Sequence, residues 1–461
     1  MRRLGLSVTA SQSIRILLIG GFLAMLAANL PGYLSADSVA QLYEGRLGVH
    51  ESWGPAAYAA VLGFFDGIVR GTGLYVVASG LVLFASLLHL RTLRPQVSWA
   101  AAAVALAMVL SPALLIYQAI VWKDVLFANL AVASFVLLAH VARVWDTPGR
   151  RPWLALCAIV LMLALGAQVR QNGLVAAVFA AAILAWTARR AGWRAAAAWG
   201  LGGLAGVVCV SLAIGAASQP REAGPDIAAA RGVRILQQYD IIGAAAHDPS
   251  LRLDILRRAD PRVDAVVRSR AVAVYSPQRV DYLALDPGAS RVLWDLPDRI
   301  ISDQWRSLVV GHPGPYLAHR WDVFRWVFLT PMIDSCLPVW TGVEGPAVKL
   351  DRLGLDRKVD GGARSMFNYA TWFLDTPAFS HLSYAILAVL VAGLLLLRRD
   401  PADMVVVGLL AAALAFTASF FVISLACDYR YLYFLDLAAM TGLFYLALDP
   451  PLAQLGLRRP R

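Results

Sequence analysis

The stretch of sequence that decides the fold is residues 153–190, WLALCAIVLMLALGAQVRQNGLVAAVFAAAILAWTARR. It holds two apolar runs, each of about the length that crosses a bilayer as a helix. A short polar turn beginning with Arg170 separates the runs, and Arg189 and Arg190 follow the second run. Loops rich in arginine face the cytoplasm. The stretch therefore predicts a helical hairpin whose tight turn lies on the outer face of a membrane.

The same alternation of apolar runs and arginine clusters recurs along the whole chain. The ten expected spans lie at about 14–30, 73–90, 99–121, 125–142, 153–169, 172–188, 195–217, 381–397, 402–425 and 431–449. The arginines at their inner ends are Arg2, Arg3, Arg91, Arg94, Arg143, Arg150, Arg151, Arg189, Arg190, Arg194, Arg398, Arg399, Arg458, Arg459 and Arg461. The positive-inside rule then places both termini in the cytoplasm. The first run is expected to be a retained helix, because its apolar stretch is long for a signal peptide.

Composition agrees with an integral membrane protein. Of the 461 residues, 59% are hydrophobic and only 15% are charged, whereas soluble domains carry about 25% charged residues. The net charge of +11 is concentrated in short inner loops, so we interpret it as a topology signal and a contact with anionic lipid rather than as a nucleic-acid interface. The expected fold is an all-α polytopic membrane protein.

The spans divide the chain into three parts. An N-terminal membrane module, 1–217, has about seven spans, and a C-terminal membrane module, 381–461, has about three. A large outer loop, 218–380, lies between them. The first outer loop, 31–72, contains an apolar stretch at 54–69 that is too short to span, so we expect an interfacial or re-entrant helix there.

The large outer loop is expected to be mainly helical. Apolar and charged residues alternate at helical spacing over 251–270 and 303–328, and the sequence HPGP at 312–315 breaks the second segment. The loop also carries several tryptophans, which favour membrane interfaces and also stack on sugar faces; the interface is the favoured interpretation for most of them. They are Trp294, Trp305, Trp321, Trp326, Trp340 and Trp372.

The four cysteines fall into two pairs. Cys157 and Cys209 lie inside apolar runs and are expected to be buried small hydrophobic residues. Cys336 and Cys427 both lie on the outer side in this topology, where a disulfide can form. Spacing alone does not fix that pairing.

Asp37 is the first candidate catalytic residue. It follows the first span by a few residues, at the expected boundary between membrane and water. There a carboxylate can accept the proton of an acceptor hydroxyl or amine, because partial desolvation raises its pKa toward a useful range. Helix capping is the alternative, since Ser35, Asp37 and Ser38 all suit the N-cap position. The sequence leaves both alternatives open.

Two further outer turns carry charge. Lys123 and Asp124 directly follow the third span. They can form a turn whose Lys side chain snorkels to the membrane surface. Alternatively, Lys123 supplies a cation for a phosphate and Asp124 an acid near the reacting carbon. Arg170 and Asn172 occupy the turn quoted above. Arginine offers a planar fork that suits phosphate oxygens, and anchoring at the outer surface is the alternative role.

The last outer turn and the first outer loop complete the candidate site. Arg430 and Tyr431 lie between the last two spans, and a salt bridge from Arg430 to Asp428 is the alternative to ligand binding. His50 and Glu51 lie in the first outer loop. Several cations on one face favour a diphosphate or phosphodiester headgroup as the ligand.

We expect metal-independent chemistry that needs no cofactor. The chain contains no D-x-D or E-x-D triplet, and His50 and Glu51 have no further ligands at a suitable spacing. It also lacks a P-loop, a dinucleotide-binding loop and a G-x-S-x-G nucleophile elbow. The donor is therefore expected to be lipid-borne rather than a cytosolic nucleotide.

Together these features resemble the C-type glycosyltransferases, polytopic enzymes that use polyprenyl-phosphate sugars and include protein O-mannosyltransferases and lipid A aminoarabinose transferases. The shared pattern is an acid in the first outer loop (Asp37), interfacial helices after it, a charged turn after the third span (Lys123), a large late outer loop and an Arg-Tyr pair near the last spans (Arg430). The stretch 312–320, HPGPYLAHR, is similar to one in uncharacterised bacterial relatives.

The resemblance implies an inverting hexosyl or pentosyl transferase of the inner or plasma membrane. It would move a sugar from a polyprenyl-phosphate carrier to a lipid, glycan or protein acceptor on the periplasmic or outer side. It implies that Asp37 activates the acceptor and that Lys123, Arg170 and Arg430 bind the lipid phosphate. Family members often carry an acidic pair in the first loop, whereas Ser38 follows Asp37 here.

Two other functions are compatible with the pattern. A transporter or flippase for a lipid-linked envelope precursor should have broken helices with polar groups at mid-membrane depth, whereas the expected span centres are rich in Ala, Leu and Val and nearly uncharged. A non-catalytic membrane assembly protein would use the large loop as a binding domain. In that case the charged turns should tolerate alanine.

Overall fold

The computed structural model describes residues 9–52, 54–147, 152–219, 227–398 and 400–450. Eight of the arginines used in the topology argument lie outside these described residues: Arg2, Arg3, Arg150, Arg151, Arg399, Arg458, Arg459 and Arg461.

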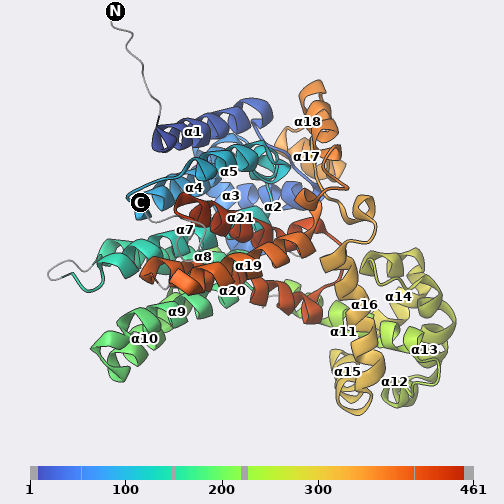
Figure 1. The fold of residues 1–461 in the computed structure, drawn as a ribbon. Coiled ribbons are helices and arrows are strands. Elements are labelled where there is room, and N and C mark those ends of the chain that lie inside the picture. Colours follow the sequence, from blue (N-terminus) through green and yellow to red (C-terminus); the bar gives the residue numbers. More distant parts are fainter. Residues whose placement is uncertain (1–8, 53, 148–151, 220–226, 399, 451–461) are drawn as a thin grey trace, which may run out of the picture. The chain divides into compact units, whose positions relative to one another are not determined.

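The described chain is built from helices, and the prediction of an all-α polytopic membrane protein is confirmed (Figure 1). Within the described residues, eight helices are long and apolar enough to cross a membrane, or up to nine if one bent pair forms a single span. These eight are α1 (Ala10–Asn29), α4 (Gly73–Leu90), α7 (Lys123–Val144), α9 (Leu174–Ala188, which a 3-10 turn extends to Ala191), α10 (Trp193–Ser218), α19 (His381–Arg398), α20 (Pro401–Ile423) and α21 (Tyr433–Leu448). Helix α8 (Trp153–Val169) is apolar but shorter, with 17 residues.

The third predicted span is not one straight helix. The segment 99–121 forms α5 (Trp99–Leu110), the single turn α6 (Pro112–Leu115) and a 3-10 turn at Tyr117–Ala119, with a bend of 61° at the break. Pro112 has no N–H to donate and disfavours a helical conformation of the residue before it. Ser111 accordingly adopts an extended conformation, with ψ of 145°. The prediction of a continuous span was therefore wrong at this point.

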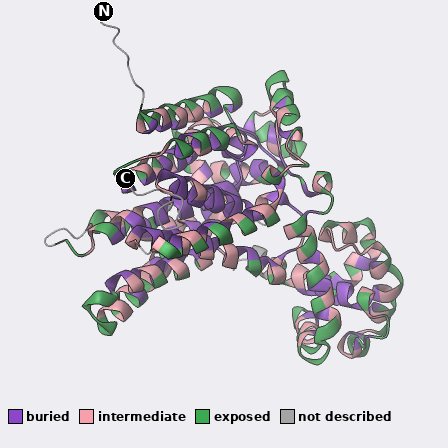
Figure 2. Cartoon of the chain, in the orientation of Figure 1, coloured by how far each residue is buried: buried purple, intermediate pink, exposed green. Residues whose placement is uncertain are grey.

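Helix α7 forms the core of the membrane part. Most of its length is buried, and it packs against α4, α8, α9 and α21 (Figure 2). By contrast α10 is largely exposed although it is strongly apolar, which is the composition of a helix that faces lipid. Cys157 on α8 and Cys209 on α10 are exposed. The prediction that they are buried was wrong, because both helices lie at the edge of the bundle.

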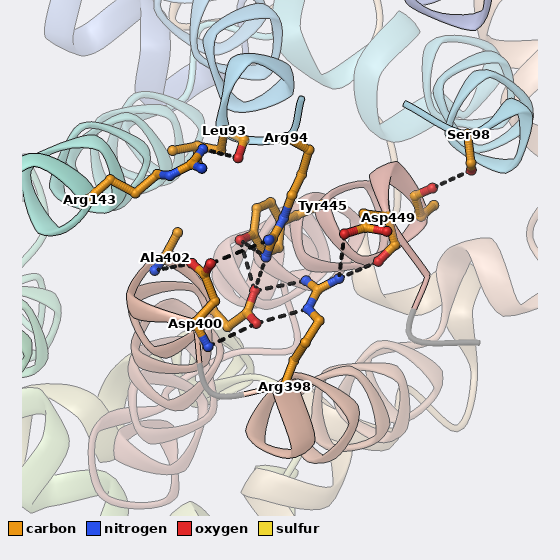
Figure 3. Close-up of polar contacts among 11 residues, drawn as sticks. Leu93, Arg94, Ser98, Arg143, Arg398, Asp400, Ala402, Tyr445 and Asp449 are labelled. Carbon is orange, nitrogen blue, oxygen red and sulfur yellow. Dashed lines mark hydrogen bonds and ion pairs between the residues drawn. The ribbon is translucent and has the colours of Figure 1, made fainter. Parts of the chain in front are cut away.

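A buried ion cluster joins helices at the arginine-rich end (Figure 3). Asp403, in the first turn of α20, is fully buried and accepts hydrogen bonds from Arg94, from Arg398 and, at 2.8 Å, from the Tyr445 hydroxyl. Charges buried at this depth are stable only when they are paired. Arg94 and Arg398, which the sequence marked only as topology signals, therefore also hold α20 and α21 to the rest of the bundle.

The chain divides into two compact units. The first comprises Met1–Arg221, Val339–Phe416 and Leu432–Arg461, and the second comprises Glu222–Pro338 and Thr417–Tyr431. Residues 339–380, which the sequence analysis grouped with the outer loop 218–380, thus belong to the first unit.

The second unit is a helical domain with its own apolar core. Its helices are α11 (Ile227–His247), α12 (Asp254–Ala259), α13 (Pro261–Val266), α14 (Pro287–Trp294), α15 (Asp298–Gly311) and α16 (Pro313–Leu329). The break predicted at 312–315 is present at His312, between α15 and α16, and Pro313 begins α16. Cys336 and Cys427 form a disulfide within this unit, so the pairing that spacing left open is present.

Candidate functional site

Asp37 lies in the first turn of α2 (Ala36–Leu47) and is exposed. The N-cap of this helix is Ser35, whose hydroxyl lies 3.1 Å from that of Ser38. Asp37 is therefore not the cap, and the capping alternative is wrong for this residue. Its carboxylate sits where the helix dipole stabilises negative charge, at an exposed position from which it can meet a ligand.

The start of α2 is bonded to the segment that leads into α7. The Tyr33 N–H donates to the carbonyl of Ala119 at 2.9 Å, and the Val121 N–H donates to the carbonyl of Tyr33 at 2.9 Å. The Ser38 hydroxyl also donates to the Val121 carbonyl at 2.7 Å. These bonds bring the turn that carries Asp37 beside the residues that immediately precede Lys123.

Trp122 adds a side-chain link to the same junction. Its indole N–H donates to the Ser35 hydroxyl at 3.0 Å, and both side chains are buried. Lys123 and Asp124 follow as the first two residues of α7. Two of the predicted site segments, far apart in sequence, are thus held together by main-chain and side-chain hydrogen bonds.

Asp124 and Arg170 form a buried ion pair. The guanidinium Nη1 lies 2.7 Å from the carboxylate Oδ1, and the two side chains are only 3% and 9% exposed. Arg170 is the C-cap of α8, and Asn172 lies half-buried in the turn that follows. The pair therefore brings the third predicted segment to the start of α7.

A buried polar network supports the broken span beneath this junction. Gln118 donates to the Tyr433 hydroxyl at 2.8 Å and to Asn129 at 3.0 Å, and the Tyr433 hydroxyl donates to the Ala113 carbonyl at 2.7 Å. Buried polar groups that are fully paired hold one conformation. The network fixes the short segment after the bend, and hence the backbone of Val121 that Ser38 contacts.

The far side of the Tyr33–Leu34 segment pairs with a short extended segment around Val343, late in the chain. The Leu34 N–H donates to the Gly342 carbonyl, and the Glu344 N–H donates to the Leu34 carbonyl, each at 2.9 Å. Burial, together with the nearby charge of Asp360, raises the pKa of Tyr33 to about 12. Its phenol therefore stays protonated at neutral pH. No local signal in the sequence could have linked these residues to Asp37.

His50 and Glu51 are placed at the other end of α2. Glu44, which is buried, accepts the backbone N–H of Glu51 at 2.8 Å and lies 3.5 Å from His50 Nδ1. The side chain of Glu51 pairs with Lys349 at 3.2 Å. Glu44 thus organises this loop, and the sequence analysis missed it. Its position seven residues beyond Asp37, on one face of a short helix, was the available signal.

Arg430 and Tyr431 belong to the second unit. Asp428 accepts from Arg430 at 3.1 Å and from Arg279 at 2.9 Å, so the salt bridge proposed as the alternative for Arg430 is present. The Tyr431 ring stacks on Phe420 with centroids 5.7 Å apart. That Arg430 shares one site with Arg170 and Lys123 stays a prediction.

The second unit also contains a buried charged cluster that sequence reasoning did not find. The Asp240 carboxylate pairs with Arg320, lies 3.1 Å from His319 Nε2 and accepts from the Trp305 indole at 2.7 Å. Burial lowers the pKa of His319, so this ring is neutral at pH 7. The available signal was the stretch HPGPYLAHR, which contains both His319 and Arg320.

No protein-family model matches the chain, and no curated protein matches it. It is similar to two solved structures, the archaeal oligosaccharyltransferase from Archaeoglobus fulgidus in complex with an inhibitory peptide and a dolichol-phosphate, and the apo form of the Archaeoglobus fulgidus oligosaccharyltransferase. Sequence identity is 12% and 13%, respectively, and the TM-score is 0.40 for both. Each alignment covers 97% of this chain and 52% of the other, so this chain spans about half the length of those proteins.

Proposed function

We propose that this protein transfers a sugar from a polyprenyl-phosphate carrier to an acceptor at the outer face of the membrane. The observation that carries the proposal is the hydrogen-bonded junction between the Asp37 turn and the start of α7 at Lys123. The exposed carboxylate of Asp37 lies in the first turn of α2, and the cation Lys123 lies at the start of α7. Both helices belong to the first unit. Transfer from a lipid phosphate needs both, a base for the acceptor and positive charge for the leaving group.

In the proposed reaction Asp37 accepts the proton of the acceptor hydroxyl or amine. The acceptor atom forms a bond to the anomeric carbon while the bond from that carbon to the phosphate oxygen breaks. The phosphate leaves with the electron pair, and the displacement inverts the anomeric configuration. Lys123 stabilises the charge that develops on the phosphate. Arg430 is proposed as a second cation for it.

The ion pair with Arg170 supports a positioning role for Asp124. The Asp124 carboxylate is buried and lies 2.7 Å from the Arg170 guanidinium, so it is engaged in holding α8 to the start of α7. We therefore propose that Asp124 orients Arg170 and fixes the start of α7. Arg170 is proposed to supply positive charge to the phosphate from the end of α8, beside the start of α7.

A transporter for a lipid-linked precursor is the second candidate, and one observation favours it. The bend of 61° in the third span is a feature of transporter helices that line a substrate path. The buried polar side chain that follows the bend, Gln118, is nevertheless bonded to Asn129 and Tyr433. These bonds give it a structural role, which supports the transferase over the transporter.

One experiment separates the two candidates. Lipid-linked sugars and surface glycans should be compared by mass spectrometry in cells with the gene, without it, and with Asp37→Asn. A transferase predicts loss of one sugar from a surface product and accumulation of its lipid-linked donor, both in the deletion and in Asp37→Asn. The purified protein in nanodiscs should then release the sugar from that donor onto an acceptor. A transporter would move the donor between leaflets without breaking the sugar–phosphate bond.

A further inference from the structure

Helix α16 in the second unit has two apolar faces. One face packs into the unit through Tyr316, Val323 and Val327, which are all buried. The opposite face carries Leu317 and Trp321, which are 48% and 54% exposed. An α-helix of a water-soluble domain has a polar outer face. The outer face of α16 therefore needs a different explanation.

The outer face of α16 extends over several turns. At helical spacing it continues from Leu317 and Trp321 to Phe324 and Phe328, whose rings stack with centroids 5.4 Å apart, and to the exposed Leu329. Arg325 is the charged residue on this face. Its side chain is 49% exposed and lies 3.8 Å from Asp322, and long basic side chains reach from an apolar surface toward water in this way.

The neighbouring helix α15 shows what a water-facing surface looks like in the same unit. Its exposed side chains include the charged Asp298, Arg299 and Arg306, with Val310 near its C-terminal end as an apolar exception, while Ile301 and Leu308 are buried in the core. The two consecutive helices thus differ in the polarity of their exposed side chains. α15 is built to face water, and α16 is built to face an apolar medium.

The apolar face of α16 is continuous with a membrane-spanning helix. Phe324 packs edge-on against Phe421 near the C-terminal end of α20, with centroids 5.9 Å apart. Val422, the next residue, is 47% exposed. α20 is one of the candidate membrane spans by length and composition, so its exposed apolar side chains are expected to face lipid. The apolar face of α16 adjoins the end of α20 at Phe421, and the same medium is therefore expected beside it.

We propose that the outer face of α16 lies in the membrane interface, with Leu317 and Trp321 inserted among the lipid acyl chains beside the end of α20. Exposed apolar patches of this kind mark interaction sites. Tryptophan is enriched at the level of the headgroups, and an amphipathic helix binds in the plane of the interface through its apolar face. The partner is thus the lipid bilayer itself. This inference does not depend on the proposed transferase activity.

The test places an environment-sensitive NBD label at single cysteines in purified protein reconstituted into nanodiscs. Cys157 and Cys209 are first replaced by alanine, while the Cys336–Cys427 disulfide is kept. Leu317→Cys and Trp321→Cys report on the proposed lipid face. Arg306→Cys on α15 is the matched control, because it is exposed in the same unit. These positions are exposed, so the substitutions should leave the fold intact.

We expect blue-shifted NBD emission at positions 317 and 321, and loss of that emission when the nanodiscs contain doxyl-labelled phosphatidylcholine. Position 306 should emit as in water and be insensitive to the doxyl lipid. Water-like emission at 317 and 321 would overturn the proposal. Blue-shifted emission without doxyl quenching would overturn it too, because it would mean that protein, such as a second copy, covers the face.

Discussion

The Arg170 guanidinium lies 2.7 Å from the Asp124 carboxylate, and both side chains are buried. The pair joins the end of α8 to the start of α7. Two residues that the sequence assigned separately to phosphate binding and to catalysis thus form one structural element. Removing one partner should leave the charge of the other buried without its ion-pair partner.

The ion pair predicts strong coupling between the two substitutions. Asp124→Asn and Arg170→Gln should each lower the free energy of unfolding by roughly 3–5 kcal/mol. The double variant should lose much less than the sum of the two, because no lone charge remains. Thermal unfolding in one detergent measures all three. The exposed pair of Asp146 and Arg190 is the control, for which losses should be small. Additive losses at Asp124 and Arg170 would contradict the prediction.

The proposed base predicts that Asp37→Asn loses turnover and keeps its fold. Asp37 is exposed and is not the helix cap, so the amide should be tolerated. Loss of a general base typically lowers the rate by about 10²–10⁴. Asp356→Asn, another exposed carboxylate of the first unit, should retain activity. Near-native transfer by Asp37→Asn would exclude Asp37 as the base and shift attention to Glu51.

The disulfide predicts that reduction destabilises the second unit. Cys336 and Cys427 are 91 residues apart in sequence, and cross-linking a loop of this size stabilises a domain by roughly 2–5 kcal/mol. Dithiothreitol, or the double variant Cys336→Ser with Cys427→Ser, should lower the unfolding temperature. Replacing Cys157 and Cys209 should not. An unchanged unfolding temperature after complete reduction, verified by thiol counting, would refute the stabilising role.

We expect the free energy of unfolding to fall in mild acid because of His319. Burial beside Arg320 disfavours the protonated ring, so the pKa of His319 is lowered in the folded state. The unfolded chain binds that proton near pH 6.5. Stability is therefore fully present above about pH 6.5 and declines as the pH falls toward the folded pKa. Neighbouring groups that contribute to this balance are Asp240, His247 and Tyr275.

Unfolding should be followed between about pH 8 and pH 5, the range in which histidines titrate. His319→Gln should flatten the decline, even if it lowers stability overall. The exposed His312 provides the control, because His312→Gln should leave the decline unchanged. An equally steep decline in His319→Gln would assign the acid sensitivity to other groups.

The topology predicts opposite labelling of two exposed arginines. Arg190 and Arg357 are both well exposed, and the positive-inside rule places Arg190 in the cytoplasm. Arg357 lies in the segment expected outside. In intact cells an impermeant maleimide should label Arg357→Cys and spare Arg190→Cys. After permeabilisation both should react. Labelling of Arg190→Cys from outside would show that the predicted membrane topology is wrong.

The sequence predicted the helices of the membrane part well, because long apolar runs have few alternatives in a bilayer. It missed the bend at Ser111, although Pro112 was a visible signal, since the surrounding residues are uniformly apolar. It could not anticipate that Asp403 pairs with Arg94 and Arg398. Contacts between residues separated by hundreds of positions leave no trace in local periodicity.

The site itself stays a prediction, and only the neighbourhood of its segments can be compared with the structure. Residues Asp37, Lys123 and Arg170 were selected because charge at span ends is rare. The structure joins the Asp37 and Lys123 segments through Tyr33 and Val121 and the Arg170 turn through Asp124. Glu44 was missed, because a lone acid in a short helix resembles a solvated face. Whether Asp37 caps α2 could not be decided from the sequence, because several suitable residues occur there. The extended backbone of Ser35 identifies that residue as the N-cap.

The Tyr33–Leu34 segment pairs with Ile120 on one side and with Val343 on the other. During synthesis the first partner therefore becomes available long before the second. At about 5–20 residues per second, Val343 leaves the ribosome roughly 15–60 s after Tyr33. During that interval the backbone beside Asp37 offers an unpaired edge, of the kind that recruits wrong partners. A nascent chain halted before Val343 would leave the Leu34 backbone without the pairing that the complete chain provides.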